Sequence, residues 1–322
     1  DEQVSLDWLE DFLAYLELAP KNLRSKYERP LNKIVKYEGV DKDAVIKASM
    51  VIAAHYNDAP DVFGLYFSFM LNPYYEKASI VIDRYKDNLA LLEDIYLKYL
   101  DLHGDEDQDG EFLAELFCRD PDFLYCYLDK ALDHMGTAFY ALNSWVSRLH
   151  FVWGDETFQS YPELISDYLF KKTGEKEWRY SAIVSQLLLC KNEDSDIVAE
   201  RQNAWILHTI EMHAAEPTRM HYLFGAISEN SADRRRIALE KFLKLNDDYA
   251  LFEKLPLESP SIGGIGSMIP YIQARIDYFL SLKPLLTGVK FLKHRQRIER
   301  SIAYWTKRIK DEEIQELLDT LG

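Results

Sequence analysis

The sequence contains few cysteines, and they follow none of the usual patterns of cysteine chemistry. Cys118, Cys126 and Cys190 form neither a CxxC pair nor an even set. A secreted disulfide scaffold or a cysteine-rich zinc site is therefore not expected. We expect reduced thiols in a cytoplasmic protein.

Long apolar segments are also missing. The chain has no apolar run of about 18 residues and no basic-plus-apolar leader, so we expect neither a membrane span nor a secretory signal. It opens with Asp1 instead of Met. We expect it to be a piece of a longer polypeptide.

Positive charge is scarce as well. The chain holds 54 Asp and Glu residues against 38 Lys and Arg residues, a formal net charge of −16. The negative electrostatic field of such a chain repels phosphate backbones and anionic membranes at long range. We therefore expect no membrane and no nucleic acid as partner, and we favour a protein ligand with a basic surface.

The alternation of apolar and polar residues that is typical of strands is hard to find, whereas one helical sequence pattern recurs. A helix-forming run, an Asn/Asp/Pro turn and a second helix-forming run occupy residues 53–69, 112–132 and 239–257, with a looser version at 183–210. Recurring helical hairpins predict an all-α fold. The specific prediction is an irregular α-solenoid of stacked hairpins, a superhelix similar to HEAT or TPR arrays. We expect one elongated region over residues 1–322, with joints near 104–110 and 255–270.

Helical spacing predicts the buried face of several helices. Apolar residues recur every three or four positions, which places them on one side of a helix. The predicted stripes are Leu92, Ile95, Tyr96 and Tyr99; Leu124, Leu128, Ala131 and Leu132; Ile272, Ile276, Phe279 and Leu280; and Ile298, Ile302, Trp305 and Ile309.

No nucleophile elbow, nucleotide-binding motif or catalytic triad context can be singled out, so we expect a non-enzyme without a cofactor. The one metal motif is the acidic loop Asp105, Asp107, Asp109 and Gly110, which matches the first half of an EF-hand calcium loop. Its twelfth position is Leu116 instead of a bidentate Glu. The alternatives are a calcium-responsive helical module and an acidic loop that caps the following helix.

Two groups of residues are candidates for partner binding by residue type. Trp and Arg dominate the residues that contribute most to interfaces. The candidates are Trp145, Arg148 and Trp153 in an aromatic run, and Arg234, Arg235 and Arg295 in two basic patches. The aromatic run keeps helical spacing, which favours a place in the core over a recognition surface. The arginines are explained more simply as solvated faces that pair with nearby acids, and RNA binding through them is an alternative that the net charge disfavours.

The C-terminal quarter carries a family resemblance. Its segments are residues 239–252, the Leu255 to Leu257 turn, a Gly/Ser stretch before Pro270, residues 275–282, 291–295 and 298–309. In this order they resemble the C-terminal helical-repeat region of bacterial STAND-type NTPases, many of which act in antiphage defence. The resemblance covers residues 236–318. It implies a sensor region, with the nucleotide-binding module and the effector elsewhere in the full-length protein.

Overall fold

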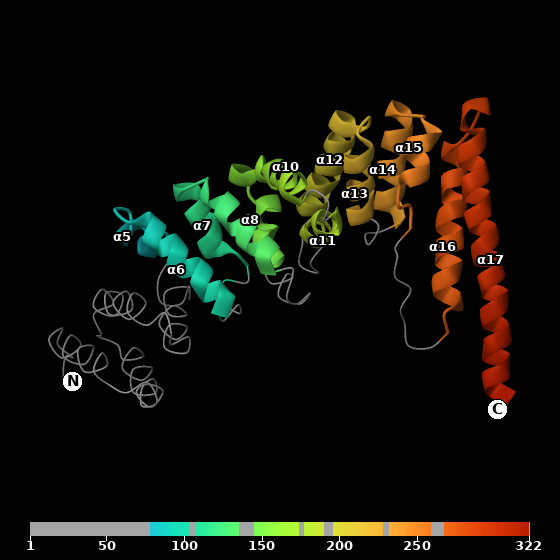
Figure 1. The fold of residues 1–322 in the computed structure, drawn as a ribbon, viewed down its shortest axis with the longest axis horizontal. Helices are drawn as coiled ribbons and strands as arrows, with labels where there is room; N and C mark the ends of the chain where they lie inside the picture. The colour runs from blue at the N-terminus through green and yellow to red at the C-terminus, as the bar shows by residue number, and fades with distance from the viewer. Residues whose placement is uncertain are drawn as a thin grey trace. The chain divides into compact units, whose positions relative to one another are not determined.

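The computed structural model describes residues 78–102, 107, 109–134, 145–173, 177–189, 196–227, 232–258 and 267–321 (Figure 1). In these ranges the regular structure is entirely helical, which confirms the predicted all-α class. Within them, no helix combines the length and the apolar character that crossing a membrane requires. The predicted hairpin at residues 53–69 lies outside the described ranges.

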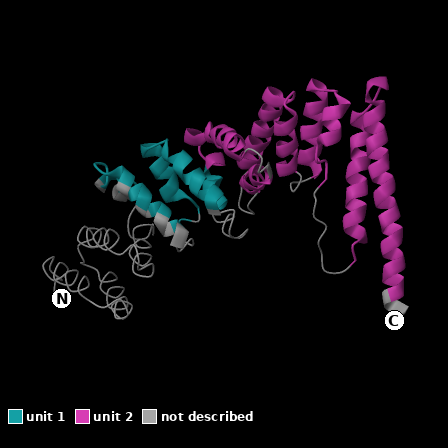
Figure 2. Cartoon of the chain, in the orientation of Figure 1, with its two compact units in different colours: residues 1–151 teal, residues 152–322 magenta. Residues whose placement is uncertain are grey.

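The chain divides into two compact units, residues 1–151 and residues 152–322 (Figure 2). This division lies at neither of the two predicted joints, 104–110 and 255–270, each of which is only partly described. The boundary lies within a short 3-10 helix, η1 (Arg148–Trp153). Each unit is described by itself below.

The described part of unit 1 is built from four α-helices around an aromatic core. They are α5 (Ala78–Arg84), α6 (Leu89–Leu102), α7 (Glu111–Arg119) and α8 (Phe123–His134). Helix α7 packs against α5 and α8, and α6 packs against α8. The predicted stripe of α8 is buried throughout, as are Leu92 and Tyr96 of α6. The side chains of Ile95 and Tyr99 lie outside the described set.

Unit 2 is a succession of helices in chain order. They are η2 (Glu156–Phe158), α10 (Tyr161–Thr173), α11 (Glu177–Leu187), α12 (Asp196–His213), α13 (Pro217–Ile227), α14 (Ala232–Leu245), α15 (Tyr249–Lys254), α16 (Ile269–Leu282), η3 (Lys283–Leu285), η4 (Val289–Phe291) and α17 (Leu292–Leu321). Figure 1 shows α12 to α15 as neighbouring, closely packed helices. It shows α16 and α17 lying side by side.

Packing in unit 2 follows one rule: each helix contacts the helix two places further along the chain. The pairs are α10 with α12, α11 with α13, α12 with α14, α13 with α15, α14 with α16, and α15 with α17. Sequential neighbours also pack, most extensively α16 with α17. Apolar faces are thereby buried between neighbours in the chain, with little need for distant segments.

Hydrogen bonds from short polar side chains mark the helix ends where the repeated sequence pattern predicts them. Between α7 and α8, the backbone N–H of Asp122 donates to the Asp120 carboxylate at 2.9 Å. Between α14 and α15, the Asp248 carboxylate accepts from the N–H of Ala250 at 2.9 Å and so caps α15. Short polar side chains stabilise helix starts and turns in this way. Two helices flank the turn at residues 112–132 and at 239–257, as predicted.

The C-terminal helices also follow the sequence signals. Proline lies at the start of α16, the position at which its missing N–H costs nothing. Ile272, Ile276 and Phe279 of the predicted stripe are buried. Leu280 is 44 % exposed and does not belong to the buried face.

Candidate functional site

The predicted aromatic recognition run is buried. Trp145 and Arg148 in unit 1 are 2 % and 0 % exposed, and Trp153 in unit 2 is 1 % exposed. The Tyr127 hydroxyl donates to the carbonyl of Trp145, and the indole N–H of Trp153 donates to the carbonyl of Leu187. These contacts confirm the alternative that the run is core. Partner binding through the three residues stays a prediction, and it would require them to leave these positions.

Asp107 of the acidic loop caps helix α7 from inside unit 1. Its carboxylate accepts from the backbone N–H of Phe112 at 2.9 Å and of Leu113 at 3.1 Å. The hydroxyl of Tyr96, on α6, donates to the same carboxylate at 2.7 Å. The capping interpretation of the loop is confirmed, with the difference that the cap is largely shielded from solvent. Three donors occupy the oxygens that a cation would use.

The calcium prediction itself is untested, because Asp105 lies outside the described residues. Asp109 is exposed. In the described ranges, no three His, Cys, Asp or Glu side chains are grouped so that they could hold a metal ion. Calcium binding by Asp105, Asp107 and Asp109 therefore stays a prediction.

Burial sets the electrostatics of this polar core. It raises the pKa of Asp107 above its ordinary value, although the three hydrogen bonds and the charge of Arg148 oppose the rise. It also raises the pKa of the phenols of Tyr96 and Tyr127, and the positive charge of Arg148 partly counteracts both rises. Both phenols therefore keep their protons and act as hydrogen-bond donors.

Gly110 permits a close approach between α7 and η1. Its φ of +73° lies in the left-handed region that glycine adopts readily. A Cβ at this position would overlap the carbonyl of Arg148 and the ring of Phe151. The glycine that suggested a calcium-loop turn is therefore required where two segments of unit 1 meet.

Unit 1 also holds a carboxyl pair that sequence reasoning missed. Burial, then the neighbouring charge of Asp120, raises the pKa of Glu93 to about 7. Burial and the nearby carboxylates, Glu93 first among them, raise the pKa of the Cys126 thiol. This thiol is therefore a poor nucleophile near neutral pH, because the thiolate is the reactive form.

The predicted basic residues of unit 2 are used within the unit. Arg234 is 8 % exposed and donates to the carbonyl of Leu188 and the side chains of Gln202 and Asn203, at 2.9 to 3.0 Å. The guanidinium of Arg235 lies 4.5 Å from the ring centroid of Tyr278.

Arg295 completes the set of predicted arginines. It donates to the carbonyls of Leu286 at 2.9 Å and Gly288 at 3.1 Å. Binding RNA phosphates through Arg234, Arg235 and Arg295 would have to compete with these internal contacts.

Two further arginines make similar contacts that sequence reasoning did not predict. Arg201 donates to the carbonyl of Trp153 at 2.9 Å. Arg297 donates to the carbonyls of Phe252 and Leu255 at the end of α15, and its guanidinium lies over the ring of Phe252. The last carbonyls of a helix lack partners, and cations there are favoured by the helix dipole. We call Arg201, Arg234, Arg295 and Arg297 the carbonyl-capping arginines.

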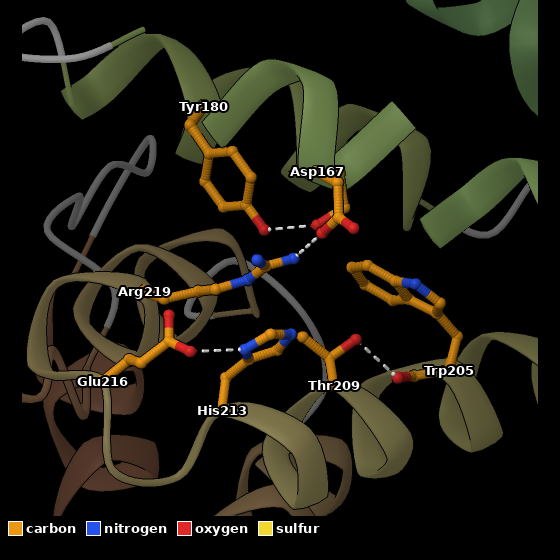
Figure 3. A network of polar contacts seen from close by, with 8 residues as sticks. Asp167, Tyr180, Trp205, Thr209, His213, Glu216 and Arg219 are labelled. Atoms are coloured by element: carbon orange, nitrogen blue, oxygen red, sulfur yellow. Dashed lines mark hydrogen bonds and ion pairs between the residues drawn. The ribbon is translucent and has the colours of Figure 1, made fainter. Parts of the chain in front are cut away.

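A polar network joins α10 to α13 in unit 2 (Figure 3). Arg219 on α13 is 7 % exposed, pairs with Asp167 on α10, and lies 5.1 Å from the ring centroid of Phe170. The hydroxyls of Tyr180 and Ser166 share a buried hydrogen bond of 2.8 Å between α11 and α10. These contacts hold successive helices in register through polar groups as well as apolar ones.

The lower part of Figure 3 shows two local contacts of the same region. Thr209 donates to the carbonyl of Trp205 at 2.9 Å, and a ring nitrogen of His213 lies 2.8 Å from a carboxylate oxygen of Glu216. Sequence reasoning missed this network, because its members lie up to 52 residues apart along the chain.

Large apolar side chains remain on the surface of unit 2. They are candidate contact residues because an aromatic or long aliphatic side chain anchors an interface well. Those on α11, α12, α16 and α17 that are about half exposed or more are Trp178 (56 %), Ile197 (55 %), Met212 (60 %), Tyr271 (49 %), Leu292 (51 %), Tyr304 (58 %), Ile314 (59 %), Leu317 (62 %) and Leu318 (56 %).

Comparison with known proteins does not assign this arrangement to a family. No protein-family model matches the chain, and no curated protein or solved structure matches it either.

Proposed function

We propose that the chain is a non-catalytic helical-repeat region, an irregular α-solenoid that recognises a protein partner. The observation that carries the proposal is the packing rule of unit 2, in which each helix contacts the helix two places further along. In a solenoid, every repeat buries its apolar face against its neighbours and leaves an extended surface exposed. Such a surface is suited to binding another macromolecule.

The exposed side chains and the charge of the chain favour a protein partner. Trp178 and Tyr271 are about half exposed and can act as anchors. The net charge of −16 favours a partner with a basic surface by complementarity. The internal contacts of Arg234 and Arg295 make a phosphate-binding surface the weaker alternative.

The cellular role that we propose is a sensor or scaffold within a larger cytoplasmic bacterial protein. It rests on the resemblance of residues 236–318 to the repeat region of STAND-type NTPases. That stretch corresponds to α14, α15, α16 and α17. In this role the ligand would be a protein, and a phage protein if the full-length protein acts in antiviral defence.

The test is affinity capture with the purified chain from bacterial lysates, with and without phage infection, and with a nuclease-treated control. A captured protein is then purified and titrated against the chain by calorimetry. We expect direct binding that weakens about tenfold or more when an anchor is removed by Trp178→Ala or Tyr271→Ala. Lys171→Ala, an exposed residue on α10, serves as the matched control.

Two outcomes would overturn the proposal. One is enrichment of nuclease-sensitive material only, which would favour an RNA-binding repeat. The other is a captured protein that shows no direct binding in calorimetry.

A further inference from the structure

Helix α17 is the longest helix described and has a well-defined inner face. It is 30 residues long, and part of it lies beside the shorter α16 (Figure 1). Ile298 is 0 % exposed and Trp305 is 8 % exposed. The indole N–H of Trp305 donates to Glu258 at 2.8 Å, and the guanidinium of Arg275, on α16, lies 4.6 Å from its ring centroid. The predicted stripe of α17 therefore faces the rest of unit 2.

The opposite side of α17 carries a second stripe with the same spacing. Its first four positions each follow a residue of the predicted inner face by two, which is about 200° around the helix. The steps between its members alternate between four and three residues, the pattern of the a and d positions of a coiled coil. We call this set the outward stripe: Arg300, Tyr304, Lys307, Asp311, Ile314 and Leu318.

Every member of the outward stripe is exposed. Tyr304, Ile314 and Leu318 each leave more than half of their surface in solvent, at 58 %, 59 % and 56 %. Arg300 makes one contact, with the hydroxyl of Tyr249 at 3.3 Å. Three large apolar side chains in heptad register on one helix face form a stripe of the kind that a second helix covers.

Charge along α17 is strongly polarised. Residues 292–310 contain seven Lys and Arg residues and a single Glu, whereas residues 311–321 contain five Asp and Glu residues and no Lys or Arg. Two parallel copies of this helix would place like charges side by side. Two antiparallel copies would place the acidic end of each against the basic stretch of the other.

The outward stripe is symmetric about Ile309, and this symmetry is what an antiparallel pair requires. A two-fold axis at residue 309 brings each position opposite another member of the stripe, with a opposite d throughout. The pairs between the two copies are Arg300 with Leu318, Tyr304 with Ile314, and Lys307 with Asp311, each formed twice.

Each of these pairs is chemically complementary. The aliphatic stem of Arg300 can cover Leu318 while its charged end stays in water. Tyr304 and Ile314 form an apolar layer, and Lys307 and Asp311 form an ion pair.

We propose that the outward stripe of α17 binds the same stripe of a second copy of this chain, as an antiparallel two-helix coiled coil centred on Ile309. The interface is isologous, so both copies contribute the same residues. Because only six layers form, we expect a dissociation constant in the micromolar range, on the order of 1 to 100 μM. Added salt weakens the dimer, since two of the layers are ion pairs.

Sedimentation equilibrium of the whole chain, from micromolar to millimolar concentration, tests the proposal through charge reversal. Lys307→Asp places Asp opposite Asp311 in both ionic layers, and Asp311→Lys places Lys opposite Lys307. We expect each variant to weaken the dimer at least about tenfold. The double variant Lys307→Asp/Asp311→Lys restores both ion pairs and should regain dimerisation, as should a mixture of the two single variants.

The matched control is Glu313→Lys, which reverses an exposed charge of the same helix at a c position, away from the seam. It should dimerise as the unmodified chain does. Helix content and thermal unfolding of each variant, followed by circular dichroism, establish that the fold is retained.

The charge pattern also separates the two orientations. In a parallel pair, Lys307 would face Lys307 and Asp311 would face Asp311, so the double variant would have the same like-charge layers as the original. Loss in both single variants and recovery in the double variant is therefore specific to the antiparallel arrangement. A chain that is monomeric at millimolar concentration, or a dimer that survives both single reversals, overturns the proposal.

Discussion

The two units bury charge in different ways. Unit 1 gathers its buried polar groups in one core, where Asp107, Tyr96, Tyr127 and Arg148 influence one another. Unit 2 distributes its buried and half-buried arginines along the helix series: Arg201, Arg234 and Arg297 donate to carbonyls, and Arg219 pairs with Asp167. Because the polar core is shared, the stability of the described part of unit 1 depends on a few positions. The stability of unit 2 depends on many smaller contributions, because its contacts are distributed.

The sharpest test of this contrast compares two glycines with positive φ. Gly110 of unit 1 meets the backbone of Arg148, whereas nothing lies within 4 Å of the Cβ position of Gly288 in unit 2. We expect Gly110→Ala to destabilise the chain by about 4 kcal/mol or more, because the added Cβ would force the backbone at Arg148 to move. Gly288→Ala should cost about 1 to 2 kcal/mol, from backbone strain alone. Urea unfolding measures both, and equal effects would contradict the contrast.

Removing the cap of α7 should give the next largest effect. Asp107→Ala leaves two backbone N–H groups and the Tyr96 hydroxyl without their acceptor. Since buried unpaired donors are costly, we expect a loss of about 3 kcal/mol, observed by denaturant unfolding. Asp109→Ala, which alters an exposed residue of the same loop, is the control. A small effect of Asp107→Ala would mean that the cap contributes little.

A carbonyl-capping arginine of unit 2 should contribute somewhat less. Arg234→Met keeps most of the aliphatic stem and removes the donors to Leu188, Gln202 and Asn203. We expect a loss of about 2 kcal/mol, confined to α11, α12 and α14. Hydrogen exchange read by mass spectrometry locates the change. Exchange that rises equally in unit 1 would show that the units are not separate in this respect.

The smallest expected effects concern pH, and they have opposite signs in the two units. The pKa of Glu93 is raised from its ordinary value of 4.5 to about 7. The contribution of Glu93 to the free energy of unfolding is therefore complete below pH 4.5 and is lost as the pH rises through 7.

His294 in unit 2 behaves in the reverse way. Burial lowers its pKa below 6.5, so its contribution is complete above 6.5 and is lost as pH falls below that value. Its ring is 1 % exposed and lies against Tyr249, Phe252 and Phe291. The charges that act on it are those of Asp247, Asp248, Lys290 and Arg297.

Two substitutions isolate these contributions. Hydrogen exchange at pH 5.5 and 7.5 should show that Glu93→Gln removes part of the pH dependence of α6 to α8. His294→Phe should remove part of the pH dependence of α15 and of the start of α17. Each comparison is made against the unmodified chain, because other carboxylates titrate in both units. A pH dependence that neither substitution alters would exclude both assignments.

Part of the fold could be predicted because it depends on neighbours in the sequence. Helical spacing identified the buried stripe of α8, and the turn residues Asp120 and Asp248 marked helix boundaries. Capping of α7 was one of the predicted roles of the acidic loop. The burial of this cap was not predicted, because Tyr96 and Arg148 reach Asp107 from other segments of the chain.

The basic residues show the limit of reading function from residue type. Arg234, Arg235 and Arg295 were candidates for partner contact because arginine is common in interfaces. Their acceptors include carbonyl oxygens, such as that of Leu188, 46 residues from Arg234. A carbonyl oxygen that lacks a hydrogen-bond donor cannot be recognised in a sequence. Every residue has the same backbone carbonyl, and only its position in the folded structure determines whether a donor is missing. The half-buried carboxyl pair of Glu93 and Asp120 was missed because the two residues lie on different segments of the chain.

The helical class, the ends of several helices and the buried side of several helices follow from the sequence alone. These depend on backbone preference and on spacing of three to four residues, which are local properties. Which charges are buried, and which aromatic residues reach solvent, depends on the folded arrangement of the helices. That outcome depends on which segments meet, and the free energy of a buried charge is set by partners that lie far away along the chain.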